Sequence, residues 1–378
     1  MIHFITWLPL PYTQALCRTL HEYYGSNFVV WYGETRREEF PFKEDLSGSF
    51  QKHYLDQCGY GKLAGNLFRD KQAVVILGGW RSPMSARVLG IKTLLRKPVL
   101  LWADHPHPRK RNAALSLARS AYLRIVNHLV SGFLACGQPT VEHLTSLGLT
   151  REKITNFPYW TDLPDSWNPP AGSGTTNTAR KPLRLVGIGR LAEVKRFDVA
   201  IQALSLTNKR AGFCQAELLL AGDGPELKGL QELAKSTGCL EQVSFAGWLE
   251  PDQIHRAIEG ADALVIPSKF EGYSAVVLEA MAAGRPVLAS DGVVAAIDRD
   301  EGTGAILFHP VGDIETLANQ IAALAEHRDQ LYRACIAARA TAEKWPPSRA
   351  IEILNQVISR TKAGKELINS RTALPLFD

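Results

Sequence analysis

The chain has 378 residues, more than one hydrophobic core usually serves, so its length predicts two domains. Its 46% apolar and 21% charged residues are typical of folded globular proteins and exclude a disordered chain. The formal net charge of +5 comes from the N-terminal part, where residues 1–166 carry 20 Lys and Arg against 13 Asp and Glu.

The start of the sequence, MIHFITWLPL, has no basic segment before its apolar stretch and no small-residue cleavage site after it. It therefore predicts a first strand rather than a signal peptide. No apolar run approaches the roughly 20 residues that a membrane-spanning helix needs. The six cysteines show no Cys-x-x-Cys pair and no zinc-type histidine spacing, so we expect them to be reduced. These features favour a cytoplasmic protein.

Apolar runs of strand length alternate with helical patterns in the first half of the chain, which indicates a parallel sheet with crossover helices. The predicted strands are 2–7, 28–32, 73–77, 98–102 and 132–135. The predicted helices are 12–24, 84–95, 112–130 and 139–147. We expect residues 1–167 to form one Rossmann-like, acceptor-binding domain.

A stretch rich in Pro, Gly, Ser and Thr, residues 168–182, is predicted to be a linker because it cannot pack a core. The alternation then restarts over residues 183–347. Strands are predicted at 183–188, 216–221, 243–246 and 263–266, and helices at 197–206, 225–237, 251–258 and 274–283. A final helical segment, within 348–378, is expected to pack back on the first domain. The fold class is α/β, with two doubly wound domains.

Basic residues are concentrated between Arg81 and Arg124, where ten Lys and Arg accompany Asp104 as the only acidic residue. Such a segment suits phosphates, either those of an anionic membrane surface or those of a lipid diphosphate acceptor. A plain solvated basic face is equally compatible with the pattern. The predicted helix 112–130 likewise fits either a membrane surface or an ordinary core contact.

The most informative segment is SKFEGYSAVVLEAMAAGRP, residues 268–286. A strand leads into a short loop with Glu271, and a helix with Ser274 at its N-cap follows, closed by Gly284. The unpaired amides at such a helix start suit a diphosphate. Glu271 and Glu279 are eight positions apart, or roughly 10–12 Å, which matches the span from the hexose to the ribose of a nucleotide-sugar. Glu279 lies in a nearly apolar helix, and a buried carboxylate needs a partner.

A second segment, LVGIGRLAEVK, brings Gly187 and Gly189 to the end of a strand and places Arg190 and Lys195 after them. Two fixed cations suit a departing nucleoside diphosphate, on which negative charge grows. GIGRLA also fits a loose dinucleotide fingerprint, but Lys209 and Arg210 stand where an acidic residue would be expected.

Two further strand ends are candidates for the same site. Gly222 belongs to a tight turn, GDGP, after the strand ELLLA. Trp248 follows the strand VSFAG and offers an apolar wall to a nucleobase. An ordinary turn also explains the GDGP sequence.

Taken in order, these motifs resemble the retaining glycosyltransferases with two Rossmann domains, family 4 (glycosyl transferases group 1). The resemblance covers about residues 183–345 through GIGRLAEVKRFDVAIQAL, LLLAGDGPE, VSFAGWL, EGYSAVVLEAMAAGRPVLAS and ILFHPVGDIETLANQI. It is looser in the first half, chiefly in GFLACGQPTVEHLTSLGLTREKITNFPYWTD. It implies the GT-B fold, with two doubly wound domains facing across a cleft.

The resemblance also implies site residues. Arg190 and Lys195 would hold the donor diphosphate, Glu271 the transferred sugar and Glu279 the ribose. The donor-binding set is completed by the residues Gly189, Gly222, Trp248, Gly272, Tyr273, Ser274 and Ala275.

Three departures from the family pattern accompany these matches. TWLPLPYT replaces a glycine-rich first loop, and Asp291-Gly292-Val293-Val294-Ala295 replaces Gly-Gly-x-x-Glu. Asp104 with His105 stands where many members carry one histidine, so either residue is a candidate to contact the sugar.

The predicted function is a metal-independent, retaining hexosyltransferase that needs no cofactor and uses a UDP- or GDP-sugar as substrate. The expected acceptor is a glycan or lipid-linked saccharide of bacterial surface polysaccharide or lipopolysaccharide, with peripheral contact to the inner face of the plasma membrane and no nucleic acid partner. The alternatives are a non-catalytic nucleotide-sugar-binding module, an NAD-dependent oxidoreductase and a UDP-sugar epimerase.

Overall fold

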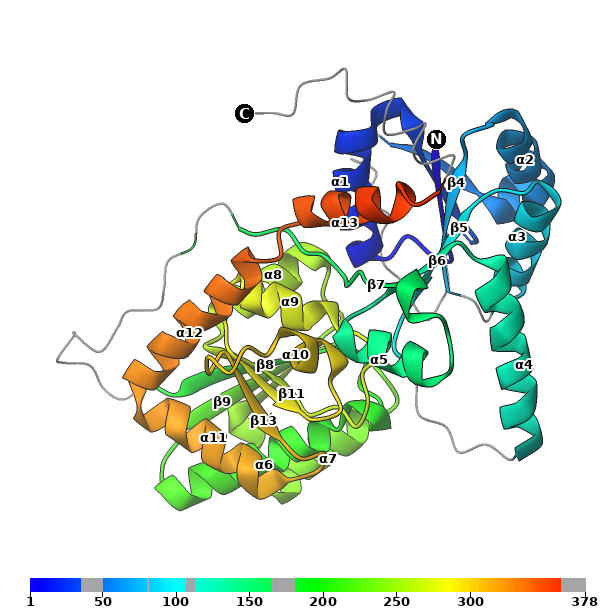
Figure 1. Cartoon of the computed structure of the whole chain (residues 1–378). Helices are drawn as coiled ribbons and strands as arrows, with labels where there is room; N and C mark the ends of the chain where they lie inside the picture. The colour runs from blue at the N-terminus through cyan, green and yellow to red at the C-terminus, as the bar shows by residue number, and fades with distance from the viewer. Residues whose placement is uncertain (35–49, 80–81, 107–112, 165–166, 168–180, 362–378) are drawn as a thin grey trace. The chain divides into compact units, whose positions relative to one another are not determined.

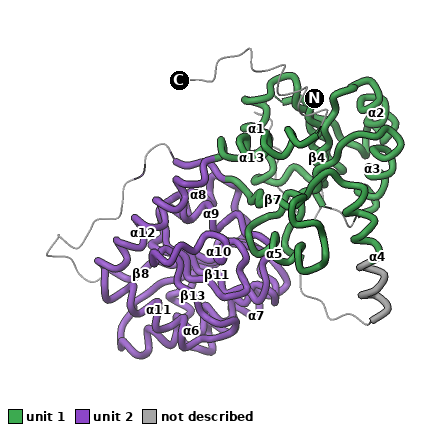
Figure 2. Tube along the Cα trace, viewed as in Figure 1, with its two compact units in different colours: residues 1–160, 347–378 green, residues 161–346 purple. Residues whose placement is uncertain are grey.

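The computed structural model describes residues 1–34, 50–79, 82–106, 113–164, 167 and 181–361, with only the backbone for residues 113–120. Contacts divide the chain into two compact units, shown in Figure 2. The N-terminal unit comprises Met1–Trp160 and Pro347–Asp378, and the C-terminal unit comprises Thr161–Pro346. Most of the predicted linker, 168–182, lies outside the described residues.

The N-terminal unit is built on seven parallel strands in the order β3-β2-β1-β4-β5-β6-β7 (Figure 1). The strands are β1 (Ile2–Thr6), β2 (Phe28–Tyr32), β3 (Gln51–Tyr54), β4 (Val74–Gly78), β5 (Val99–Ala103), β6 (Gly132–Ala135) and β7 (Ile154–Asn156). The helices are α1 (Pro11–Tyr24), α2 (Leu55–Arg69), α3 (Pro83–Leu94), α4 (Ala113–Leu129), α5 (Gln138–Ser146) and α13 (Ser348–Ile358), with 3-10 turns at Gly25–Asn27 and Arg151–Lys153.

The C-terminal unit repeats this plan with six parallel strands in the order β10-β9-β8-β11-β12-β13. The strands are β8 (Leu183–Ile188), β9 (Ala216–Ala221), β10 (Val243–Gly247), β11 (Ala263–Ile266), β12 (Val287–Ser290) and β13 (Ile306–His309). The helices are α6 (Phe197–Ala211), α7 (Leu227–Ser236), α8 (Pro251–Gly260), α9 (Ala275–Ala282), α10 (Val294–Arg299), α11 (Ile314–Glu326) and α12 (Arg328–Glu343), with 3-10 turns at Glu193–Lys195 and Leu240–Gln242.

The strands form where apolar runs can be buried on both faces of a sheet. All five residues of β2, FVVWY, are buried, as are those of β1 and β5. Parallel strands covered by helices on both sides need such continuous apolar sequences. In each unit the order of strands reverses beside the first strand, so both sheets are doubly wound, as predicted.

Every predicted strand and helix of the first half is present within two residues of its predicted bounds. Three elements of that unit were not predicted: β3, α2 and β7. The sequence of β3, QKHY, is polar and partly exposed, and α2 is kinked at Gly59, whose φ of 73° is not helical. Their periodicity is therefore weak.

The last described helix, α13, packs on α1 at the start of the chain. Tyr24 Oη donates a hydrogen bond of 2.6 Å to Asn355 Oδ1, and Asn355 Nδ2 donates one of 3.1 Å to Tyr23 Oη. Of the predicted C-terminal helical segment 348–378, residues 362–378 lie outside the described residues. None of the helices in the described ranges has the length and apolar composition needed to cross a bilayer.

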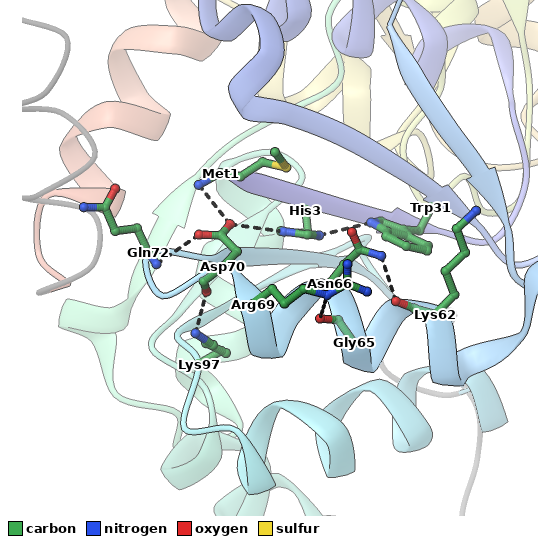
Figure 3. A network of polar contacts seen from close by, with 10 residues as sticks. All are labelled: Met1, His3, Trp31, Lys62, Gly65, Asn66, Arg69, Asp70, Gln72 and Lys97. Atoms are coloured by element: carbon green, nitrogen blue, oxygen red, sulfur yellow. Dashed lines mark hydrogen bonds and ion pairs between the residues drawn. The ribbon is translucent and has the colours of Figure 1, made fainter.

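A buried polar network lies at the beginning of β1 (Figure 3). Trp31 Nε1 donates to His3 Nδ1 at 3.1 Å, so the neutral imidazole carries its proton on Nε2, which faces Asp70 Oδ2 at 3.3 Å. The amino group of Met1 lies 3.1 Å from the same oxygen. Burial lowers the pKa of His3. The hydrogen bond from His3 and the charge of the Met1 amino group outweigh desolvation and lower the pKa of Asp70 to about 2.

The Asp70→Asn variant is expected to unfold more easily than the parent chain at pH 7, by about 1–2 kcal/mol after allowance for partial solvent screening. Asp70 has a lowered pKa in the folded state, so its stabilising effect is complete above its ordinary pKa near 4 and disappears as the pH falls toward 2. Thermal denaturation followed by circular dichroism from pH 2.5 to 7.5 measures this difference. The exposed Glu232→Gln variant is the control, and a constant difference at every pH would contradict the assignment.

Candidate functional site

The loops after β8 and β9 cross each other in close backbone contact. Gly189 N donates to Ala221 O at 2.9 Å, and Gly222 N donates to Gly247 O at 2.7 Å. A Cβ on Gly222, whose φ is 139°, would lie 2.0 Å from Gly189 O. Glycine is therefore required at residue 222 because any side chain would collide with the neighbouring backbone. The GDGP turn joins two loops at the carboxyl edge of the sheet, where open α/β sheets bind ligands.

Lys195 and Glu271 form an ion pair at this edge. Lys195 ends the 3-10 turn that follows β8, and its side chain lies 3.5 Å from the position that a Cβ on Gly189 would occupy. Ser268 Oγ donates a longer hydrogen bond, 3.5 Å, to the same Glu271 oxygen that Lys195 contacts. The fold thus brings together two residues 76 positions apart.

The backbone of the loop before α9 is fixed on both sides. Lys269 N donates to Val194 O at 2.8 Å, and Glu271 N donates to Gly292 O at 3.0 Å. A Cβ on Gly292 would lie 2.5 Å from Lys269 O, so this glycine is needed for the close approach. The segment that replaces the family's Gly-Gly-x-x-Glu therefore supports the backbone of Glu271, a role that the sequence did not reveal.

The helix α9 begins and ends close to its predicted bounds. Ser274 is the N-cap residue but donates or accepts no capping hydrogen bond through its side chain, so the predicted capping role of its hydroxyl is wrong. The amides of Gly272 and Ala275 make no hydrogen bond to other described residues. Gly284, with φ of 64°, ends the helix, and a Cβ there would lie 2.2 Å from Trp167 Nε1. At the other end of α9, the amides of Gly272 and Ala275 are therefore unpaired donors at the carboxyl edge of the sheet.

Glu279 lies inside α9 with a half-buried side chain that has no hydrogen-bond partner among the described residues. Burial raises the pKa of its carboxyl group, and the nearby His255 of α8 opposes this rise only in part. A desolvated carboxylate without a protein partner is costly to keep. Hydroxyl groups of a ligand would satisfy it.

Three further residues of this unit were predicted to belong to the site: Arg190, Trp248 and Tyr273. Arg190 is exposed beside Gly189, and its guanidinium makes no hydrogen bond or ion pair with a described residue. Trp248 follows β10 and is 39% exposed. Tyr273 points elsewhere: its hydroxyl donates to Asp298 Oδ2 at 2.7 Å, which holds the loop on α10. Its predicted place in the donor set is therefore limited to the backbone.

Asp104 and His105 follow β5 in the N-terminal unit. Asp104 Oδ1 accepts a hydrogen bond of 2.7 Å from Tyr159 Oη, and the Tyr159 ring stacks on Tyr12 at 4.0 Å. Desolvation raises the pKa of Asp104, and the hydrogen bonds of its carboxyl group with Cys136 and Tyr159 oppose this rise only in part. The His105 ring lies 5.0 Å from that of His143, and burial lowers the pKa of His105. Sequence reasoning missed Tyr12 and Tyr159, whose only signal was their place near strand ends.

The dinucleotide interpretation of GIGRLA fits the structure poorly. In such a fingerprint the glycine loop opens directly into a helix whose first amides hold the diphosphate. Here α6 begins at Phe197, eight residues after Gly189, with the 3-10 turn Glu193–Lys195 between them. All six cysteines are free, and no cluster of three or more possible metal ligands occurs within the described residues.

Comparison with known proteins finds a family match within the C-terminal unit. Residues 182–327 match the family model Glycosyl transferases group 1. The chain is 33% identical over 154 residues to D-inositol 3-phosphate glycosyltransferase of Nocardia farcinica, covering 39% of this chain and 33% of that protein. It is 30% identical over 141 residues to the lipopolysaccharide core biosynthesis glycosyltransferase LpsD of Rhizobium meliloti, covering 37% and 36%. The matches thus span about a third of each of these relatives.

The fold of the whole chain is similar to that of solved structures. HepE of Anabaena, solved in complex with UDP, superposes with a TM-score of 0.71 at 16% identity, over 99% of this chain and 100% of that one. At this identity the likeness shows the fold alone, and that fold is GT-B. The segment 182–327 of this chain thus matches the glycosyl transferases group 1 family and lies in the C-terminal unit of a chain with the GT-B fold.

Proposed function

We propose that the chain is a retaining glycosyltransferase that moves a hexose from a UDP- or GDP-sugar to a glycan or lipid-linked acceptor. The observation that carries this proposal is the Lys195–Glu271 ion pair, held at the carboxyl edge of a sheet beside a helix start with unpaired amides. A cation and a carboxylate at one point can serve the diphosphate and the sugar of one donor. The UDP bound to the HepE structure supports a nucleotide donor by analogy.

Donor binding is proposed to exchange the partners of this ion pair. Lys195 turns from Glu271 to the diphosphate, with Arg190 as a second cation, and Glu271 then accepts hydrogen bonds from sugar hydroxyls. The amides of Gly272 to Ala275 bind the distal phosphate, and Glu279 accepts from the ribose. Trp248 and the glycine turn at Gly222 border the nucleobase.

The cations act where charge develops during the reaction. When the glycosidic bond breaks, its electron pair stays on the leaving phosphate oxygen, and fixed positive charge stabilises that oxygen most in the transition state. The proton of the attacking hydroxyl passes to the same phosphate on the front face, so the configuration at the sugar carbon is retained. Asp104 or His105 is proposed to hydrogen-bond the sugar. These residues perform every role without a metal ion.

The acceptor is proposed to be part of a bacterial surface polysaccharide or lipopolysaccharide. Support comes from the Rhizobium meliloti relative, which is a lipopolysaccharide core biosynthesis glycosyltransferase. The basic N-terminal part of the chain suits an acceptor that lies at an anionic membrane, and the reaction would then occur at its inner face. No nucleic acid takes part in this function.

A ligand screen tests the proposed donor class. A thermal-shift series with UDP, GDP, ADP and NAD is expected to show stabilisation by UDP or GDP and none by NAD, because binding to the folded state raises the melting temperature. Stabilisation by NAD alone would favour the oxidoreductase. A non-catalytic binding module would bind UDP yet leave UDP-glucose intact with truncated lipopolysaccharide, whereas the transferase would release UDP.

The Glu279→Gln variant is expected to be more stable than the parent chain at pH 7.5 and to bind nucleotide more weakly. Because burial raises the pKa of Glu279, its ionised form destabilises the fold above its ordinary pKa near 4.5, and the variant should melt higher than the parent at pH 7.5 but equally at pH 4. Affinity for the stabilising nucleotide should fall roughly tenfold or more, since a charge-assisted hydrogen bond to the ribose is lost. Titration calorimetry and melting curves measure both effects. A variant that binds UDP and GDP normally would remove Glu279 from the site.

Lys195→Met and Glu271→Gln are each expected to lower kcat about a hundredfold or more with the donor that the screen identifies, because each removes a contact to charge that changes in the transition state. Lys228→Gln, an exposed charge on α7, is the matched control and should keep normal rates. Nucleotide release measured at saturating donor gives kcat directly. Near-normal turnover of either site variant would overturn the proposed mechanism.

A further inference from the structure

A pocket of ≈ 830 Å³ lies at the amino edge of the sheet in the N-terminal unit, between the start of β4–β6 and the ends of α3 and α4. Its charged lining is entirely basic: Lys71, Lys92, Arg96, Lys97, His128 and Arg360. Among the described residues, no Asp or Glu lines it. A concave surface with charge of one sign focuses its field on an ion of the opposite sign.

The permanent cations of this pocket make no ion pair with any carboxylate in the described part of the chain. Lys97 Nζ donates to the backbone oxygen of Asp70 at 2.6 Å, and Arg360 donates to that of Glu152 at 3.3 Å. The carboxylate of Asp70, whose backbone oxygen Lys97 contacts, pairs instead with Met1 and His3 (Figure 3). Among the described residues, the positive charge of the pocket therefore has no carboxylate partner.

Lys92 is a buried member of the pocket lining, and its ammonium group lies close to a second one, that of Lys153. Its side chain is 8% exposed and donates to Leu129 O in the floor of the pocket. Burial, followed by repulsion from Lys153, lowers the pKa of Lys92. Lys153 Nζ in turn donates to Val130 O at 3.1 Å, so two ammonium groups converge on the end of α4. An anion in the pocket would relieve this repulsion.

Arg96 occupies a backbone position that normally selects glycine. It follows α3 with a φ of 52°, and Lys97 N donates to Lys92 O at 3.0 Å to close the helix. Glycine adopts this left-handed conformation at no steric cost, whereas a residue with a Cβ is disfavoured there. The chain thus keeps an arginine at a strained turn, where it adds a charge to the pocket.

The pocket is distinct from the sugar-contacting edge of the same unit. Pro98, in its lining, precedes β5, whereas Asp104 follows this strand at the other end. Five residues of β-strand span roughly 16 Å, so one phosphate cannot contact both edges. We propose that this pocket is a second, independent site that binds phosphate groups, carried either by a soluble anion or by the head group of an anionic lipid.

The test uses a substitution that removes a positive charge from the pocket and at the same time relieves a strained turn, so that a loss of binding cannot be due to unfolding. In Arg96→Gly the left-handed turn is relieved, so the melting temperature should be unchanged or higher while the pocket loses a cation. Combined with Lys71→Gln, this change should weaken phosphate binding roughly tenfold or more. Lys228→Gln with Lys235→Gln, two exposed lysines of α7, is the matched control and should bind as the parent chain does.

Two probes identify the source of the phosphate at constant ionic strength. Titration calorimetry with inorganic phosphate detects a soluble ligand, and sedimentation with phosphatidylglycerol against phosphatidylcholine vesicles detects a lipid head group. Either response, lost in the pocket variant and kept in the control and in Lys195→Met, supports the site and excludes binding at the donor edge. Absence of both responses, or equal binding by the pocket variant, overturns it.

Discussion

The candidate site depends on one interaction, the ion pair between Lys195 and Glu271. It joins the turn after β8 to the loop before α9, and the lysine side chain lies beside Gly189. The two side chains are only 19% and 16% exposed. A pair in such surroundings adds little net stability because desolvation offsets the attraction. Its physical value is that both charges stand in place before a ligand arrives, and exchange of partners costs little.

Polar groups around this pair fall into two kinds. Some are satisfied by the protein and fix the loop: Tyr273 bonds to Asp298, and Glu271 N bonds to Gly292 O. Others, above all the carboxylate of Glu279, have no partner in the described part of the chain. Local violations of polar pairing are expected at functional sites, where stability is given up for ligand binding. The unsatisfied carboxylate of Glu279 therefore supports the candidate binding site at this edge of the sheet.

Much of the fold was predictable because its strongest elements are apolar and regular. β2, β8 and β11 have their predicted bounds, since a buried parallel strand is a continuous apolar run. Two elements that escaped prediction, polar β3 and glycine-containing α2, lack such a signal. The return of α13 to α1 includes a hydrogen bond between Tyr24 and Asn355, 331 residues apart, which no local pattern encodes.

The sequence by itself determined the alternation of strands and helices, the spacing of Glu271 and Glu279, and the family motifs of residues 183–345, because these are local patterns of residue type. Only the tertiary structure decided which side chains meet. It paired Lys195 with Glu271, made Gly292 a backbone support, and left Arg190 without a hydrogen bond or ion pair to a described residue. It also gathered scattered lysines and arginines into one pocket. Such contacts depend on strand order and loop crossings, which join residues far apart in the chain.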